Sequence, residues 1–131
     1  MASTTFSGPV TSTNGFIGAV TGNITGNVTG NLTGDVFASN QSLSGAGAVN
    51  TTDMLTSLTT TGASQALTLA NGTTGQVKII VHTVDGGSAV LTPTTKIGFS
   101  TITFTAVGDA VYMIYTATGW AIVGSRGVTI A

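Results

Sequence analysis

His82, Asp85 and Ser88 are the residues whose types and spacing come nearest to a catalytic group, because they combine an imidazole, a carboxylate and a hydroxyl in one short stretch. A nucleophilic serine needs an adjacent base, and the base needs an orienting acid. Here Asp85 falls at a predicted turn and Ser88 follows two glycines. We therefore interpret the grouping as accidental and expect His82 to lie on the polar edge of a strand.

The sequence contains few side chains that could bind a metal or a cofactor. The chain has no Cys, no Glu, four Asp residues and one His. Structural and catalytic metal sites need three or more ligands at suitable spacing, and no such spacing occurs. Symmetry could still gather His82 or Asp35 from several copies to hold an ion. Phosphate-binding loops and dinucleotide fingerprints are also missing. We predict no catalytic residues, no cofactor, no metal and no enzymatic activity.

Charge is scarce along the whole chain. Charged residues make up 5% of the 131 residues and the net charge is −1, whereas an ordinary domain carries about 25% charged residues. Without a basic field, nucleic acid is not expected as a partner. Lys78, Lys96 and Arg126 are too few for a basic patch, but each can contribute a single contact to an acidic partner surface. Copies of this chain carry too little charge to repel one another strongly. The composition therefore predicts a homo-oligomer.

A four-residue repeat of an apolar residue, Thr, Gly and Asn or Asp runs from Val20 to Val36. Each Gly costs a helix about 1 kcal/mol relative to Ala, so extended backbone is expected. In an extended chain one face then alternates an aliphatic residue with Gly. If the Gly-Asn pairs turn the chain instead, each short rung carries one aliphatic residue. Neither form makes a core within one chain, but two or three copies around a shared axis can make one.

Residues 1–50 are therefore predicted to form an extended N-terminal assembly arm, with a domain boundary near residue 50. Residues 39–48 are small and of low complexity, which indicates a connection or a tightly packed loop. A flexible linker is the alternative for the repeat, but linkers do not place aliphatic residues at strict spacing. The residues predicted to make assembly or partner contacts are Phe6, Phe16, Val20, Ile24, Val28, Leu32 and Val36.

Residues 51–131 show short β-branched and aromatic runs between turn signals, which predicts an all-β fold. We expect a compact antiparallel β-sandwich or barrel. Hairpin-type turns are expected at Asn71-Gly72 and at Asp85-Gly86-Gly87. The expected strands span residues 54–58, 66–70, 76–84, 89–92, 101–106, 110–116, 120–123 and 127–130. A module of this size is only marginally stable by itself, so oligomerisation is expected to stabilise it.

Three local patterns refine this prediction. The alternation of apolar residues changes parity between Phe99 and Ile102, so a bulge or turn is expected near Ser100. Both faces are apolar from Val111 to Tyr115, which indicates a central strand covered on both sides or one covered by a neighbouring subunit. Trp120, with two tyrosines, could form a carbohydrate platform, although its place within a strand pattern favours the core.

Targeting signals do not change this interpretation. The first residues, Met1–Phe6, lack a basic segment followed by an apolar one, so export by a signal peptide is not expected. The longest apolar runs are a few residues, far short of a membrane-spanning helix. We expect no membrane partner.

Several stretches together resemble small virion proteins of tailed bacteriophages, especially marine and cyanobacterial phages. These are the repeat from Val20 to Asp35 and residues 91–93, 108–111, 118–124 and 127–131. The resemblance covers most of the chain and brings no catalytic residues with it. It implies a capsid decoration (cement) protein, a head fibre or a piece of a tail fibre, commonly a homotrimer. The location that it implies is the virion capsid surface, after synthesis in the host cytoplasm.

Two functions follow as expectations. The first is a trimeric capsid decoration protein whose arms intertwine or clamp onto the major capsid protein, because the chain is short for a complete tail fibre. The second is a receptor-binding fibre tip or adhesin that recognises a host surface glycan.

Overall fold

The computed structural model describes residues 31 and 33–131, and in this part of the chain it contains ten strands and no helix. The chain divides into two compact units, Met1–Gly34 and Asp35–Ala131. Of the first, only Asn31, Thr33 and Gly34 are described, and all three are exposed. The predicted repeat therefore lies almost entirely outside the described residues. The strands are β1 Asn40–Ser44, β2 Gly47–Val49, β3 Leu55–Thr59, β4 Gln65–Leu69, β5 Val77–Val84, β6 Ala89–Pro93, β7 Ile102–Phe104, β8 Ala110–Tyr115, β9 Trp120–Arg126 and β10 Thr129–Ile130.

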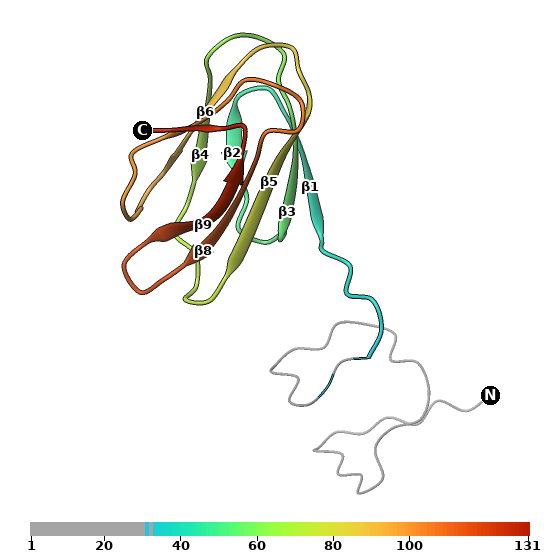
Figure 1. Cartoon of the computed structure of the whole chain (residues 1–131), viewed down its shortest axis with the longest axis vertical. Coiled ribbons are helices and arrows are strands. Elements are labelled where there is room, and N and C mark those ends of the chain that lie inside the picture. Colours follow the sequence, from blue (N-terminus) through green and yellow to red (C-terminus); the bar gives the residue numbers. More distant parts are fainter. Residues whose placement is uncertain (1–30, 32) are drawn as a thin grey trace, which may run out of the picture. The chain divides into compact units, whose positions relative to one another are not determined.

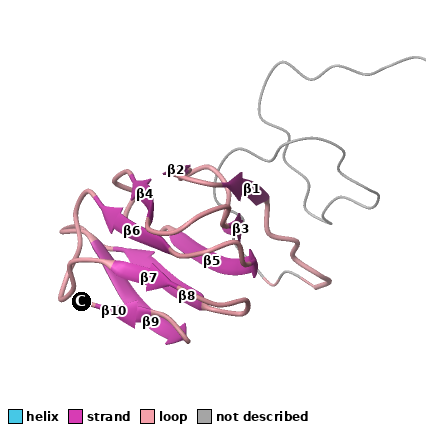
Figure 2. Ribbon diagram, turned by 90° about the horizontal axis from the view of Figure 1, so that it is seen from above, coloured by secondary structure: helices cyan, strands magenta, loops and turns pink. Residues whose placement is uncertain are grey.

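The ten strands form two five-stranded sheets that pack face to face (Figures 1 and 2). Sheet A has the order β1-β3-β5-β8-β9, and sheet B has the order β10-β7-β6-β4-β2. The first six strands alternate between the sheets, so each successive pair adds one strand to sheet A and one to sheet B. The beginning of the module is thus wound as a flat coil of three turns.

The all-β prediction is confirmed, but the prediction of an antiparallel module is wrong for this coiled part. β1, β3 and β5 pair in parallel, as do β2, β4 and β6, whereas β7 to β10 add antiparallel strands. The turns at Asn71-Gly72 and Asp85–Gly87 lead to the opposite sheet rather than back along the same one, so the next strand in each sheet arrives in the same direction. Both sheets stay open, so the barrel alternative is not realised.

The compact unit begins before the predicted boundary near residue 50. Residues 40–44 and 47–49, predicted as part of a connection, form β1 and β2 and pair with β3 and β4. Small polar residues have low strand propensity, so pairing with a formed neighbour selects this conformation. The side chain of Gln41 helps, because its Oε1 accepts hydrogen bonds from the Asn50 N–H at 2.9 Å and Thr56 Oγ1 at 3.0 Å.

The core lies between the sheets, and its strands match those expected from the sequence in position. Eight strands predicted from Met54 onward match β3 to β10 within a few residues. The expected change of parity near Ser100 occurs in the loop before β7, where Gly98 adopts a φ of 78°. The fully buried apolar side chains include Leu58, Leu67, Leu69, Ile80, Leu91, Ile102, Phe104, Met113 and Trp120.

Candidate functional site

The outer face of sheet A is apolar across its last three strands and carries one charged side chain, Arg126, at its border. Inward-facing residues of β5 such as Lys78 and Ile80 are buried, so their neighbours Val77, Ile79 and Val81 point outward. The registers align these with outward residues of β3, β8 and β9. We call this surface the apolar face; its members are Leu55, Val77, Ile79, Val81, Ala110, Tyr112, Ile114 and Ala121.

This arrangement explains why the sequence of β8 is apolar on both faces. Val111 and Met113 lie in the core, whereas Tyr112 remains 39% exposed on the apolar face. Cover by a neighbouring subunit stays a prediction. The other predicted explanation, a central strand covered on both sides, holds for the position of β8 between β5 and β9 but not for the cover. Its outer side chains have no covering layer in the described part of the chain.

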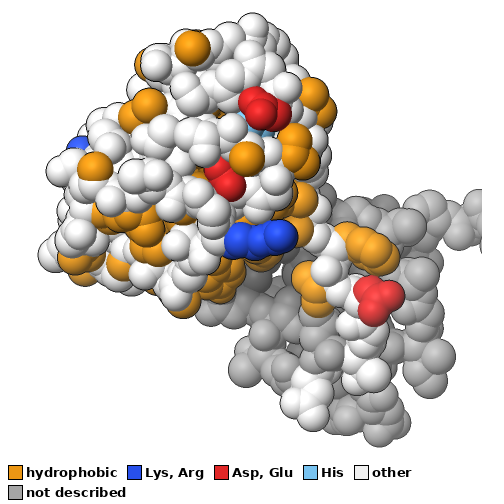
Figure 3. Space-filling view, turned by 45° about the horizontal axis from the view of Figure 1, so that its top comes forward, with side chains coloured by type: hydrophobic (Ala, Val, Ile, Leu, Met, Phe, Trp, Pro, Cys, Tyr) orange, Lys and Arg blue, Asp and Glu red, His pale blue; other side chains and the backbone are white. Residues whose placement is uncertain are grey.

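The outer face of sheet B is different, because threonine dominates it. Thr68 on β4 is paired with Thr92 on β6, and Thr103 on β7 is paired with Thr129 on β10. All of these are exposed or half-buried. Threonine hydroxyls keep this face hydrated, so the sandwich has one wettable face and one apolar face. Figure 3 shows one side of the molecule, where orange apolar patches lie on a mostly white surface with few charged side chains.

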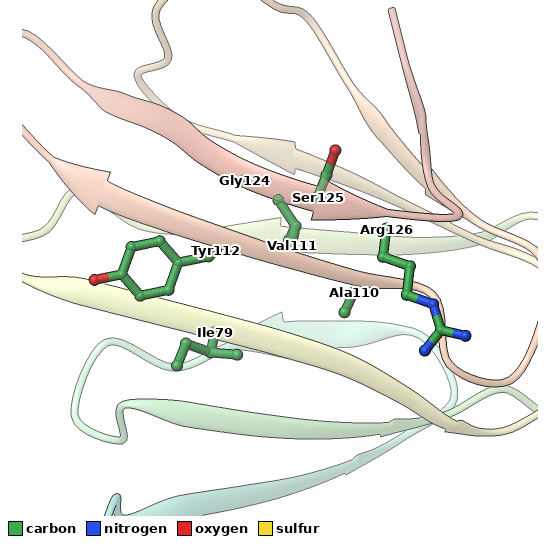
Figure 4. Close-up of a pocket in the computed structure, with 7 residues that line it drawn as sticks. All are labelled: Ile79, Ala110, Val111, Tyr112, Gly124, Ser125 and Arg126. Carbon is green, nitrogen blue, oxygen red and sulfur yellow. The ribbon is translucent and has the colours of Figure 1, made fainter.

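A shallow hollow of about 180 Å³ lies within the apolar face, between β5, β8 and β9. It is lined almost entirely by apolar surface. Tyr112 lies beside Ile79 on one side, and Arg126 borders the other (Figure 4). The registers explain the hollow: Gly124 pairs with Tyr112 and supplies no side chain at this position. An added Cβ on Gly124 would meet nothing within 4 Å.

Two further apolar side chains are exposed just before β1. Val36 is 70% exposed and Phe37 is 89% exposed. A single exposed apolar residue needs no explanation, but an adjacent pair that includes an almost fully exposed phenyl ring is unusual. Val36 was predicted as an assembly residue and lies in this exposed segment. Phe37 was not predicted, because it follows the repeat and breaks its period.

The interior of the sandwich holds a polar cluster around His82. Thr60 Oγ1 accepts a hydrogen bond from the Gly86 N–H at 2.9 Å and donates one to the Gly87 carbonyl at 3.0 Å. Its contact of 3.0 Å with His82 Nε2 is then one in which the imidazole N–H donates. His82 is fully buried, and its Nδ1 has no partner in the described structure.

The prediction that His82 lies on a polar strand edge is therefore wrong. His82 points into the core because it shares the inward face of β5 with Ile80. Its hydrogen-bond partner is Thr60, whereas Asp85 Oδ1 accepts from the Gly87 N–H and Ser88 Oγ accepts from the Ser64 N–H. The three residues do not form a hydrogen-bonded catalytic chain with one another.

Asp109 holds the loop between β7 and β8. Its Oδ2 accepts hydrogen bonds from the backbone N–H groups of Thr105 at 2.7 Å and Ala106 at 3.0 Å. Burial by itself raises the pKa of this carboxyl, but the hydrogen bonds from Thr105 and Ala106, with a further contribution from His82, outweigh burial and hold the pKa below its usual value of 3.8. Asp109 is thus a structural carboxylate.

Lys78 is the second buried ionisable side chain, at 1% exposure, and its Nζ donates to the Asp53 carbonyl at 2.8 Å. Burial lowers the pKa of Lys78 to about 8, and the nearby Asp53 carboxylate offsets part of this effect. Since the pKa is lower in the folded protein than the ordinary 10.5, the unfolded chain binds more protons between these values. We expect the free energy of unfolding to rise with pH from about 8 to 10.5.

Urea titrations at successive pH values, at fixed protein concentration, test this expectation. Lys78→Met is the matched control, because it keeps the length of the side chain and removes the titrating amine. The wild-type rise in stability should be reduced in this variant. An equal rise in both proteins would exclude Lys78 as its source.

Trp120, considered as part of a carbohydrate platform, lies in the core instead. It is fully buried, its Nε1 donates to the Ala70 carbonyl at 2.9 Å, and its ring meets Tyr115 edge-on with centroids 5.1 Å apart. Of the three aromatic residues, only Tyr112 is exposed.

The structure does not describe the other predicted site residues. Phe6, Phe16, Val20, Ile24, Val28 and Leu32 lie outside the described residues. Within residues 31 and 33–131, no three metal-ligating side chains gather in a group. The same part of the chain has no helix long and apolar enough to cross a membrane.

Comparisons with known proteins give no match for this chain among protein-family models, curated proteins or solved structures.

The sequence carried a signal for the hollow that the predictions did not use. Gly124 and Arg126 are two residues apart on β9, and strand alternation places both on the outer face. Together with the double-sided apolar pattern of β8, this spacing indicates a gap bordered by a cation. The sequence could not show that Gly124 pairs with Tyr112, because that register depends on the bulge between Tyr112 and Met113.

Proposed function

We propose that this protein is a structural virion component, a capsid decoration protein that binds and stabilises the major capsid shell as a homotrimer. The observation that carries the proposal is the apolar face of sheet A. A protein with a charged fraction of 5% has little electrostatic repulsion to keep such faces apart. Burial of apolar area then favours assembly by about 25 cal/mol per Å².

The exposed segment before β1 supports the same proposal. Val36 ends the repeat that carries most of the other predicted assembly residues, and it is followed by exposed Phe37. These side chains leave the sandwich at β1, at one edge of sheet A. Exposed apolar side chains at this edge are available for contact with a neighbouring subunit or the shell.

A glycan-recognising fibre tip is the alternative, and it has less support. Its proposed platform needed the indole of Trp120 at the surface, whereas this ring is buried. A decoration role needs only a broad surface of repeated contacts, whose energies sum over many copies.

Virions of the phage that carries this chain provide the test, compared with particles that lack it. Particles without the protein should lose their DNA at a lower temperature and resist osmotic shock and chelation less well. Purified wild-type protein added back should restore resistance. Tyr112→Asp, which places a charge on the apolar face, should not restore it. Thr92→Asp, the matched change on sheet B, should. Equal resistance of particles with and without the protein contradicts the proposal.

A further inference from the structure

One acidic and one basic side chain of the compact unit form no hydrogen bond or ion pair with other described residues. Seven side chains of the whole sequence are charged. Five of them make hydrogen bonds within the fold: Asp53, Asp85, Asp109, Lys78 and Lys96. The remaining two, Asp35 and Arg126, have no hydrogen bond or ion pair with another described residue and are both exposed. They are of opposite sign.

Each of these two charged residues lies close in sequence to an exposed apolar feature, which is a phenyl ring for Asp35 and the hollow for Arg126. Asp35 is two residues before Phe37, which is 89% exposed. Arg126 is two residues after Gly124, which forms the gap of the hollow. In an extended segment residues two apart share one face and lie about 6.6 Å from each other. When residues 35–37 dock as extended backbone, their acid and phenyl ring match the base and the apolar hollow of β9 in both chemistry and spacing.

The size of the hollow suits an aromatic ring. An apolar cavity of about 150 Å³ accommodates benzene, and the hollow measures about 180 Å³. Tyr112 and Ile79 provide apolar walls on which the edge of a ring can pack. The missing side chain at Gly124 leaves space above the strand that a ring from outside can fill.

Within one chain, Phe37 and the centre of the hollow lie on opposite sides of sheet A's strand order. One row of cross-strand partners leads from the first residue of β1 to the hollow: Asn40, Leu55, Ile79, Tyr112 and Gly124. Four strand spacings of about 4.8 Å separate Asn40 from Gly124, or about 19 Å. Phe37 is three residues from Asn40 and reaches at most about 11 Å from it. Phe37 is 89% exposed in its own chain and does not occupy this hollow, so we take the ring that fills it to come from another molecule.

We propose that residues 35–37 of a second copy of this chain dock on the apolar face, with Phe37 in the hollow at Gly124 and Asp35 paired with Arg126. The segment then runs antiparallel to β9. This contact rests on the self-assembly proposed above and identifies its partner surface. Because the donor and acceptor surfaces differ, the contact is head-to-tail, and it closes into a ring when the rotation between copies allows it.

The test is native mass by light scattering over a range of concentrations, with circular dichroism to monitor the fold. Gly124→Val is the central variant, because the new side chain meets open space in its own subunit and fills the hollow. It should leave the fold intact and weaken self-association roughly ten- to hundredfold, as Phe37→Ala should. Thr92→Val on sheet B and Val84→Ala, which shortens an exposed apolar residue outside the hollow, are matched controls that should associate like wild type.

A charge exchange tests the register of the contact. Asp35→Arg and Arg126→Asp should each weaken self-association, and the double variant should restore it. A monomeric wild type, unchanged association of Gly124→Val, or a double variant as weak as the single ones would overturn the docking proposal. If particles are nevertheless protected, the decoration function stands without this contact. If the double variant associates again but the protein does not protect particles, the docking contact is supported and the decoration function is contradicted.

Discussion

Trp120→Ala should lower the free energy of unfolding by about 4 kcal/mol, within the range of about 3–5 kcal/mol for truncation of a buried large aromatic residue. Trp120 is completely buried, so its removal leaves a cavity in addition to the lost apolar transfer. It also removes the edge-on contact with Tyr115 and the donor to the Ala70 carbonyl. Since the unit has no disulfide, much of the variant should be unfolded at moderate temperature.

Denaturant titration at a fixed protein concentration measures this effect, because association also contributes to apparent stability. Trp120→Phe is the matched control: it keeps an aromatic ring and loses the indole N–H, so it should be destabilised less than Trp120→Ala. A Trp120→Ala protein with wild-type stability would contradict the buried position. It would also return the indole to the surface, where a glycan platform requires it.

Thr60→Val should cost about 2–4 kcal/mol, although it replaces a side chain with one of nearly equal volume. The Thr60 hydroxyl joins three groups: it accepts from the Gly86 N–H and from the His82 imidazole, and it donates to the Gly87 carbonyl. Each buried polar group that loses its partner costs about 1–3 kcal/mol. The His82 N–H is the most affected, because the ring is fully buried and its other nitrogen already lacks a partner.

Thr60→Ser separates the hydroxyl from the methyl group. It keeps every hydrogen bond and should cost less than about 1.5 kcal/mol, a value typical of one buried methyl or methylene group. Unfolding midpoints of the three proteins at constant transition slope give the comparison. Equal stability of Thr60→Val and wild type would show that water or a rearranged loop takes the place of the hydroxyl.

The sequence predicted the strands of the module well because their cause is local. Runs of β-branched and aromatic residues, such as those of β5 and β8, favour extended backbone, although in these two strands they do not show which face becomes the core. Turn residues between the runs end them near the observed residues. The expectation that Trp120 packs in the core follows from its place within a strand pattern, and the structure confirms it.

The parallel order of the first six strands depends on contacts that no short window contains. A turn such as Asp85–Gly87 looks the same whether the chain returns to its own sheet or crosses to the other. Here Gly86 and Gly87 lie so close to residues 60–62 that an added Cβ would meet their backbone within 2.4 Å. That close approach, between segments far apart in sequence, directs the chain across. β1 and β2 also exist only because β3 and β4 provide partners.

Composition by itself determined that this is an almost uncharged protein with few groups for acid–base or metal chemistry. The pattern of short β-branched and aromatic runs between turns determined the all-β fold class. Only the tertiary structure decided which side chains remain at the surface. It buried His82, Lys78 and Trp120, and it left Phe37, Tyr112 and Arg126 exposed. The physical reason is that alternation assigns residues to two faces, whereas the packing of the two sheets decides which of these faces becomes the core.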